Sequence, residues 1–279
     1  MRDKRKRGFA PCAAAVFFLL AAVFAGASYA ASEITINGST TILPFAHSTA
    51  EAFMKLNPKV RISVSGGGSG NGAKALIDGM IRIAAMSREM KEDEIAKAKA
   101  RGVNPVKHVV AVDCIVPIVH RTNPVNNLTA GQLRAIYAGE ITNWREVGGE
   151  DKKIAVLGRD TSSGTFEVWE EKIMKGAYVT PRALIVASSG AMVQSVANNP
   201  MAIGYDSLGY VNPSLLKPLS VNGVKGTPET ARAKKIITSR PLFMYTNGEP
   251  KGDVKKYLDF LLSADGQKYV TQEGFVSLR

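Results

Sequence analysis

The chain has 279 residues, 45% of them hydrophobic, and a formal net charge of +12. This length suits one large domain or two modest domains, each with its own hydrophobic core. The positive charge favours an anionic ligand, an anionic surface or nucleic acid as the partner.

The first 30 residues have the pattern of a secretory signal peptide. Residues 2–7 carry a net charge of +4, residues 9–27 are mostly apolar, and Ser28-Tyr29-Ala30 supplies small residues at the cleavage positions. An uncleaved anchor is the alternative, since about 17–25 apolar residues can span a bilayer. Pro11 and the small residues favour cleavage. We therefore predict a signal peptide at residues 1–30 and a periplasmic mature chain that begins near Ala31.

The mature chain would carry a net charge of +8, and its export makes nucleic acid an unsuitable partner. Cys114 is its only cysteine, which excludes an internal disulfide, and we expect it to be a small buried hydrophobe. No later apolar segment is long enough to cross a membrane. Trp144 and Trp169 are expected to pack in cores or on lobe surfaces.

Strand-like and helix-like segments alternate along this chain. Strands are predicted at 34–36, 60–64, 81–86, 154–157, 184–186 and 202–205. Helices are predicted at 45–56, 73–80, 91–100, 132–137, 166–173, 192–197 and 254–262. Two further extended segments cover 106–120, with an interruption at Pro117, and 241–245. Repeated strand–helix units predict parallel sheets with helices on both faces. We therefore expect an α/β fold of two lobes, joined by the two extended segments as a hinge.

Polar residues follow the predicted strands at the points where ligands bind in open α/β sheets. The junctions are residues 37–41, 65–72, 87–88, 158–165 and 187–190, and they contain Ser, Thr, Gly and Arg. Helix amino termini offer free N–H groups to anions, and glycine permits close backbone approach. Hydroxyls donate hydrogen bonds, and arginine adds a charged fork that fits a tetrahedral oxyanion. The recurrence of these residues predicts an anion-binding cleft.

Simpler interpretations exist for each junction. Ser or Thr before a helix is usually a cap, a glycine run can be a flexible loop, and a single arginine is usually a surface charge. Gly68-x-Gly70-x-x-Ala73 is a degenerate dinucleotide fingerprint, but the next strand ends at Ser87-Arg88 and supplies no acidic ribose ligand. His47, His108 and His120 lack metal-binding spacing. We therefore predict no cofactor and no metal.

At these junctions the chain resembles the phosphate-binding proteins of phosphate ABC importers. The similar segments are Gly38-Ser39-Thr40-Thr41 with Pro44, residues 65–72, residues 133–144 ending in Ile141-Thr142-Asn143-Trp144, Arg159-x-x-x-Ser163-Gly164-Thr165, and Ala202-Ile203-Gly204-Tyr205. The resemblance implies the two-lobed periplasmic binding fold of type II. Lobe 1 would take residues 32–117 plus 235–279, and lobe 2 would take 118–234.

The resemblance also implies ligand contacts. Carried over position by position, they fall on Thr40, Thr41, Ser69, Arg159, Ser163, Gly164 and Thr165. The junctions add Ser39, Ser87 and Arg88 as candidates. Some family members have an aspartate, which accepts a proton from phosphate, where this chain has Arg88. In this chain the candidates for the group that accepts the phosphate proton are therefore the hydroxyls of Ser39, Thr40 and Ser87, a backbone carbonyl, and Asp160.

The expected function is capture of inorganic phosphate and its delivery, by a monomer, to the membrane permease of an ABC importer. The nearest alternative is a protein of the same fold that binds sulfate or molybdate. Another alternative is a surface-bound signalling or adhesion module. An exported phosphoester hydrolase is another, but neither Ser69 nor Ser163 is accompanied by a histidine or carboxylate cluster. We predict that sulfate competes at large excess. With the added charge of Arg88, phosphate affinity should rise from about pH 5.5 to about pH 8.

Overall fold

The computed structural model describes residues 32–279, so the predicted signal peptide lies outside the described residues. The strands are β1 Ser32–Gly38, β2 Val60–Gly66, β3 Ile83–Met86, β4 Pro105–His120, β5 Asn127–Leu128, β6 Ala155–Arg159, β7 Leu184–Val186, β8 Ala202–Ser207, β9 Leu216–Pro218, β10 Ser220–Val221 and β11 Ser239–Asn247. The helices are α1 Leu43–Leu56, α2 Ser69–Ile77, α3 Glu92–Ala100, α4 Ala130–Ala138, α5 Gly164–Trp169, α6 Ser189–Ala197, α7 Pro228–Arg232, α8 Gly252–Leu262 and α9 Ala264–Gln272. Two 3-10 turns, η1 Trp144–Val147 and η3 Leu208–Tyr210, and a π-helical segment, η2 Glu170–Met174, complete these elements.

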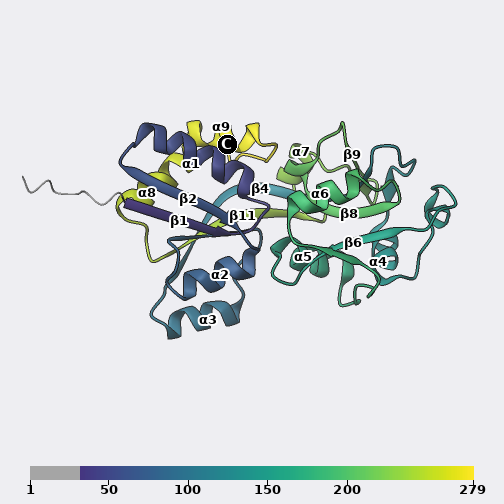
Figure 1. Ribbon diagram of the computed structural model, residues 1–279, viewed down its shortest axis with the longest axis horizontal. Coiled ribbons are helices and arrows are strands. Elements are labelled where there is room, and N and C mark those ends of the chain that lie inside the picture. The colour runs from purple at the N-terminus through teal and green to yellow at the C-terminus, as the bar shows by residue number, and fades with distance from the viewer. Residues whose placement is uncertain (1–31) are drawn as a thin grey trace, which may run out of the picture. The chain divides into compact units, whose positions relative to one another are not determined.

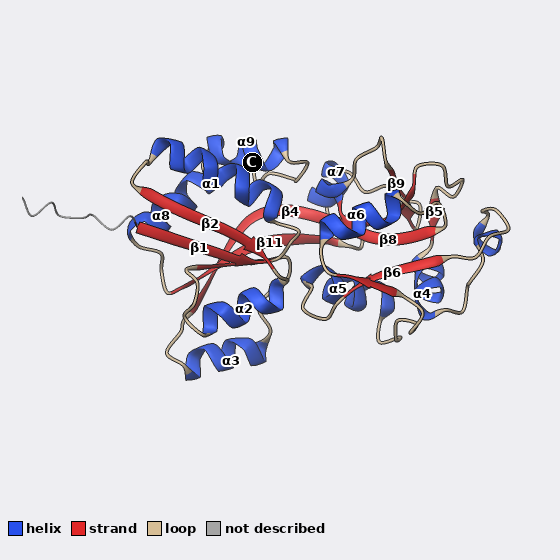
Figure 2. Ribbon diagram, viewed as in Figure 1, coloured by secondary structure: helices blue, strands red, loops and turns tan. Residues whose placement is uncertain are grey.

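The main strands follow one another in the order β2-β1-β3-β11-β4-β8-β6-β7 (Figure 2). β1 pairs in parallel with β2 and β3 in the first half, and β6 pairs in parallel with β7 and β8 in the second. β4 and β11 run antiparallel between these two groups. The parallel strands, each followed by a helix, confirm the predicted α/β class.

β4 connects the two halves of the sheet. Its residues 105–114 pair with β11, and its residues 115–119 pair with β8. The predicted interruption at Pro117 is wrong: the residue faces Tyr205 within the ladder, and its carbonyl accepts a hydrogen bond from Leu219 N at 2.9 Å. A single missing donor leaves the flanking hydrogen bonds intact, so the strand continues.

Helices cover both faces of each half (Figure 1). In the first half, α1, α8 and α9 lie on one face of the sheet, and α2 and α3 lie on the other. In the second half, α6 packs on β6 and β8, and α4 and α5 lie on the opposite side. β4 and β11 are the segments that run between the halves, as the two-segment hinge requires.

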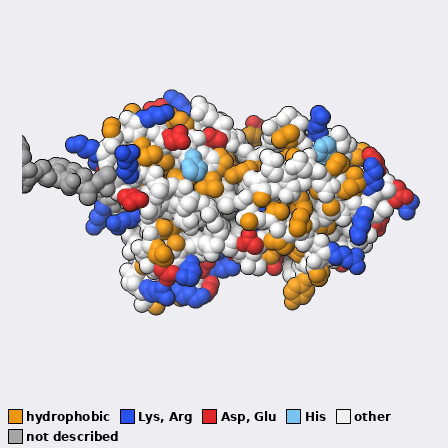
Figure 3. Space-filling model, viewed as in Figure 1, with side chains coloured by type: hydrophobic (Ala, Val, Ile, Leu, Met, Phe, Trp, Pro, Cys, Tyr) orange, Lys and Arg blue, Asp and Glu red, His pale blue; other side chains and the backbone are white. Residues whose placement is uncertain are grey.

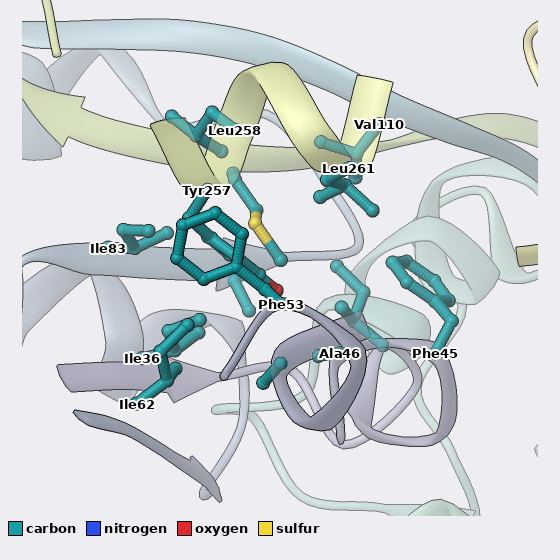
Figure 4. Close-up of a cluster of buried hydrophobic side chains, with 14 of the residues drawn as sticks. Ile36, Phe45, Ala46, Phe53, Ile62, Ile83, Val110, Tyr257, Leu258 and Leu261 are labelled. Carbon is teal, nitrogen blue, oxygen red and sulfur yellow. The ribbon is translucent and has the colours of Figure 1, made fainter. Parts of the chain in front are cut away.

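The core of the first half is a cluster of aromatic and aliphatic side chains between α1, α8 and the sheet (Figure 4). Phe53 of α1 and Tyr257 of α8 meet edge to face with ring centroids 5.6 Å apart. The last residues of two predicted helices are exposed. Leu56 is 70% exposed because it is the last residue of α1, and Met80 is 73% exposed because α2 ends at Ile77.

The second half has its own buried clusters. Trp144 and Trp169 are 2% and 0% exposed and pack in one cluster, which confirms their predicted role. Cys114 is fully buried in a neighbouring cluster, as predicted. The predicted helix at 91–100 is also confirmed as α3, and charged side chains of both signs cover it (Figure 3). Within residues 32–279, no helix has the length and apolar character needed to cross a bilayer.

Candidate anion-binding site

The loops at the carboxyl ends of the strands meet between the two halves of residues 32–279. Thr41 Oγ1 in the first half lies 2.9 Å from Thr165 Oγ1 in the second. The N–H of Gly70 donates to the carbonyl of Ser162 at 2.9 Å. All the candidate residues are buried, with exposures from 0% to 8% for those with side chains: Ser39, Thr40, Thr41, Ser69, Ser87, Arg88, Arg159, Ser163, Gly164 and Thr165. The predicted junctions therefore lie together where the two halves meet.

Arg159 lies beside these residues at the end of β6, with 2% of its surface exposed. Its Nε donates to Val186 O at 3.1 Å and its Nη2 donates to Ala187 O at 3.3 Å. Nη2 also lies 3.2 Å from Thr40 Oγ1. No carboxylate within residues 32–279 forms an ion pair with this guanidinium. A buried cation without a paired anion is costly, so this arrangement favours an anionic ligand.

Three packed aromatic residues fix the backbone that carries Arg159. Trp169 and Tyr205 stack with ring centroids 4.3 Å apart and planes 5° from parallel. The Tyr205 hydroxyl accepts the N–H of Arg159 at 3.3 Å, and the Tyr137 hydroxyl donates to Leu157 O at 3.1 Å. The rings therefore hold the end of β6 in place.

A chain of serine hydroxyls lines the first half of the site. Ser39 Oγ donates to Ser87 Oγ at 2.9 Å, and Ser87 Oγ lies 3.3 Å from Ser69 Oγ. Gly164 packs directly against this chain, because a Cβ on Gly164 would lie 2.4 Å from Ser69 Oγ. Ser163 caps α5 by accepting the N–H of Phe166 at 3.3 Å. Glycine is thus required where the two halves touch.

Arg88 forms ion pairs with two carboxylates at the edge of the site. Its Nη1 and Nη2 donate to the two oxygens of Glu94 at 2.6 and 2.8 Å. Its Nε lies 2.9 Å from Glu167 Oε2, as an ion pair without hydrogen-bond alignment. Lys91 Nζ also lies 2.9 Å from Glu167 Oε2. Burial alone would lower the pKa of Arg88, but the carboxylates of Glu94 and Glu167 raise it.

Because both carboxylates neutralise it, Arg88 does not add an uncompensated positive charge to the site. Glu94 lies in the first half and Glu167 in the second, so Arg88 links the halves instead. Phosphate affinity was expected to rise from about pH 5.5 to about pH 8 because of the added charge of Arg88. These ion pairs remove that reason.

Glu167→Gln is expected to weaken anion binding by about 3- to 10-fold, through faster dissociation. The substitution removes an ion pair that forms only when the halves touch, while Arg88 keeps Glu94. Stopped-flow dissociation measurements would show it. Glu171→Gln is the matched control, because among residues 32–279 the ion-pair partner of Glu171 is the surface residue Lys172. Equal dissociation rates in the two variants would contradict the conclusion that the ion pair of Arg88 and Glu167 links the two halves.

A buried polar network joins the hinge strands to the site. Asp113 of β4 accepts from Arg240 Nε of β11 at 2.9 Å and from Ser207 Oγ of β8 at 2.7 Å. Arg240 Nη1 donates to Ser87 O at 3.1 Å. Burial raises the pKa of Asp113, against the lowering effect of Arg240. The network couples both crossing strands to residues at the site.

Two further residues reach the site although they were not among the candidates. Ser189 is the first residue of α6, and its Oγ lies 3.4 Å from both Thr40 Oγ1 and Arg159 Nη1. Asp206, at the end of β8, is fully buried beside them. Ser189 belongs to the junction 187–190 that was noted in the sequence. Asp160, by contrast, accepts from the N–H of Ser162 at 2.9 Å and shapes its own turn.

The chain is similar to several known proteins. The family model described as PBP superfamily domain matches residues 25–265. The phosphate-binding protein PstS of Bacillus subtilis is 35% identical over 257 residues, covering 90% of this chain and 82% of that protein. PstS of Borreliella burgdorferi is 30% identical, covering 88% of this chain and 90% of that protein.

A solved structure from Clostridium perfringens, described as a phosphate ABC transporter substrate-binding protein with bound phosphate, matches with a TM-score of 0.83. It is 35% identical and covers 89% of this chain and 100% of that chain. The fold is therefore the two-lobed periplasmic binding protein fold that the resemblance implied. The chain belongs to the PBP superfamily and, within it, to the family of the phosphate-binding proteins PstS.

Proposed function

We propose that this protein captures inorganic phosphate between its two lobes and delivers it to the membrane permease of an ABC importer. The observation that carries the proposal is Arg159, a buried guanidinium without a carboxylate partner among residues 32–279, beside hydroxyls from both halves. The names of the related proteins support phosphate as the anion.

In this proposal the binding residues divide by chemistry. Arg159 supplies the charge, and the hydroxyls of Ser39, Thr40, Thr41, Ser69, Ser87, Ser163 and Thr165 supply hydrogen bonds. Gly164 permits the lobes to meet. Arg88 acts from the edge, through its ion pairs with Glu94 and Glu167. Ser189 joins this set because its hydroxyl lies beside Arg159.

The proposed lobes are residues 32–117 with 235–279, and residues 118–234. Buried packing supports two units, because Ala111 and Leu242 belong to a first-half cluster while Ile115 and Ile236 belong to second-half clusters. This packing indicates that the chain crosses from one lobe to the other near residues 112–114 and 237–239. These positions lie a few residues from the predicted boundaries at Pro117 and Lys235. Ligand contacts made only in the closed form would draw the lobes together.

We further propose that the protein is exported by its signal peptide, acts as a periplasmic monomer and releases phosphate chemically unchanged. The basic and apolar pattern of residues 1–30 supports export. Membership in a family of binding proteins supports capture without turnover, without a cofactor and without nucleic acid as a partner.

Phosphate is expected to bind with one site per chain and to reduce the radius of gyration. Calorimetric titration would measure binding, and small-angle scattering with and without phosphate would measure closure. Binding without a change in radius would contradict closure and favour a rigid cleft. Absence of phosphate binding, or turnover of p-nitrophenyl phosphate by pure protein, would contradict the proposed function.

A further inference from the structure

The second half of the protein contains a pocket that the proposed phosphate site does not use. Its volume is about 300 Å³, at the lower end of the range of small-molecule sites. Lys153, shortly before β6, and Asn199, shortly before β8, are among the residues that line it. The pocket therefore lies at the amino ends of these strands, whereas Arg159 lies at the carboxyl end of β6.

The local structure explains why this space is left unfilled. α4 ends at Gly139, whose φ of 82° is left-handed and stops the helix. β6 lies beside α4 (Figure 1), and β7, the last strand in the sheet order, has only three residues. The segment before β7 is held near α4, because the N–H of Thr180 donates to Tyr137 O at 2.8 Å. α4, β6 and residues 180–184 therefore form three walls around the pocket.

The lining of the pocket is mainly apolar. Aliphatic side chains from all three walls contribute to it, namely Ile136, Ile141, Ile154, Val156, Leu157 and Leu184. Leu184 is 61% exposed. Single exposed apolar side chains are common on protein surfaces, but one on the wall of an apolar pocket gains free energy when a ligand covers it. The lining therefore fits the apolar body of a ligand.

Two cationic side chains give the pocket a positive charge. Lys153 and Arg182 line it, and both are exposed. Neither forms an ion pair within residues 32–279, since Asp151, the acidic residue closest to Lys153 along the chain, pairs with Arg145. Among the described residues that line the pocket, none is acidic, and Glu140 lies between two lining residues without lining it. The charge therefore favours an anionic headgroup.

We propose that this pocket binds an organic anion with an apolar body, of the kind that a medium-chain fatty acid represents. Its carboxylate would pair with Lys153 and Arg182, whose planar fork matches a carboxylate, and would accept hydrogen bonds from the hydroxyls of Thr142 and Thr180. Its chain would cover Leu184 and the other aliphatic residues. Inorganic phosphate lacks an apolar body, so the ligand of this pocket belongs to a different chemical class.

Decanoate is the probe for this proposal, and calorimetry of the purified protein measures its binding. We expect one site per chain. Decanoate should bind about 15-fold more tightly than octanoate, because each buried methylene contributes about 4-fold. Decyltrimethylammonium has the same chain length and the opposite charge, so it should bind at least about 10-fold more weakly than decanoate. Saturating phosphate should leave decanoate binding unchanged, because the two sites lie at opposite ends of β6.

Two substitutions test the two parts of the ligand. Arg182→Glu is expected to lower decanoate affinity by about 10-fold or more, because it replaces an attraction by a repulsion. Leu184→Gln should lower it by about 5-fold by removing part of the apolar wall. Lys225→Glu is the matched control, because Lys225 is exposed and does not line the pocket, while the change in net charge equals that of Arg182→Glu. All three positions are exposed, so melting temperature and phosphate affinity should stay at wild-type values.

Nuclear magnetic resonance of the wild type would locate the ligand. Decanoate should shift the amide signals of residues 136–142, 153–157 and 180–184. Shifts confined to the surroundings of Arg159, displacement of decanoate by phosphate, or an equal loss in Lys225→Glu would overturn the proposal. Equal affinities for decanoate and decyltrimethylammonium would overturn it too, since the cations would then have no role. Absence of decanoate binding would overturn it in favour of an acidic peptide as the partner of this surface.

Discussion

Arg159→Ala is expected to lower phosphate affinity by about 100-fold or more. A charged hydrogen bond contributes about 1.5–3 kcal/mol, and Arg159 can direct both Nη atoms to one anion. The guanidinium is 2% exposed and has no ion-pair partner among residues 32–279, so no neighbour replaces its charge. Calorimetric titration at neutral pH and low salt would measure the loss.

Arg134→Ala is the matched control, because Arg134 is an exposed arginine on α4. It should bind phosphate as the wild type does. Arg159→Lys should recover only part of the affinity, because an ammonium group lacks the planar fork. Equal affinities of Arg159→Ala and Arg134→Ala would remove Arg159 from the site.

Gly164→Ala is expected to weaken binding by about 5- to 150-fold by preventing full closure. The new Cβ would lie 2.4 Å from Ser69 Oγ, 2.7 Å from Ser87 Oγ and 3.0 Å from Arg88 Cγ. These atoms are buried and fixed by the serine hydrogen bonds, so the lobes must separate. Overpacking of this kind costs about 1–3 kcal/mol.

Gly190→Ala provides the comparison, because its new Cβ would meet only Ser188 Oγ at 4.0 Å. Both glycines lie in the first turn of a helix at the site, so helix propensity affects them alike. Scattering should show that Gly164→Ala with phosphate remains more open than Gly190→Ala. Wild-type affinity and closure in Gly164→Ala would contradict the packing argument.

The fold could be predicted largely because its pattern is local. Alternation of strand-like and helix-like segments identified β1, β2, β3, β6, β7 and β8, and also the helices that follow the first five of these strands. The short strands β5, β9 and β10 were not predicted, because none of them has the three consecutive apolar residues that marked the equally short β7. Pro117 misled the prediction, because proline is usually a strand breaker and its tolerance depends on the neighbouring strands.

The site was partly predictable for a different reason. Its residues follow strands directly, so topology alone brings Thr40, Ser69, Arg159 and Thr165 to one edge. The role of Arg88 could not be foreseen, because its partner Glu167 lies on another lobe and sequence distance conceals the ion pair. Ser189 and Asp206 also follow predicted strands, but only the packed structure shows that they lie beside Arg159.

The most direct test of the account is a crystal structure of the protein grown with phosphate. We expect a tetrahedral anion between the lobes, within hydrogen-bond distance of Arg159, Thr40 and Ser189. An ordered phosphate elsewhere on the protein, with the guanidinium of Arg159 directed away from it, would contradict the account.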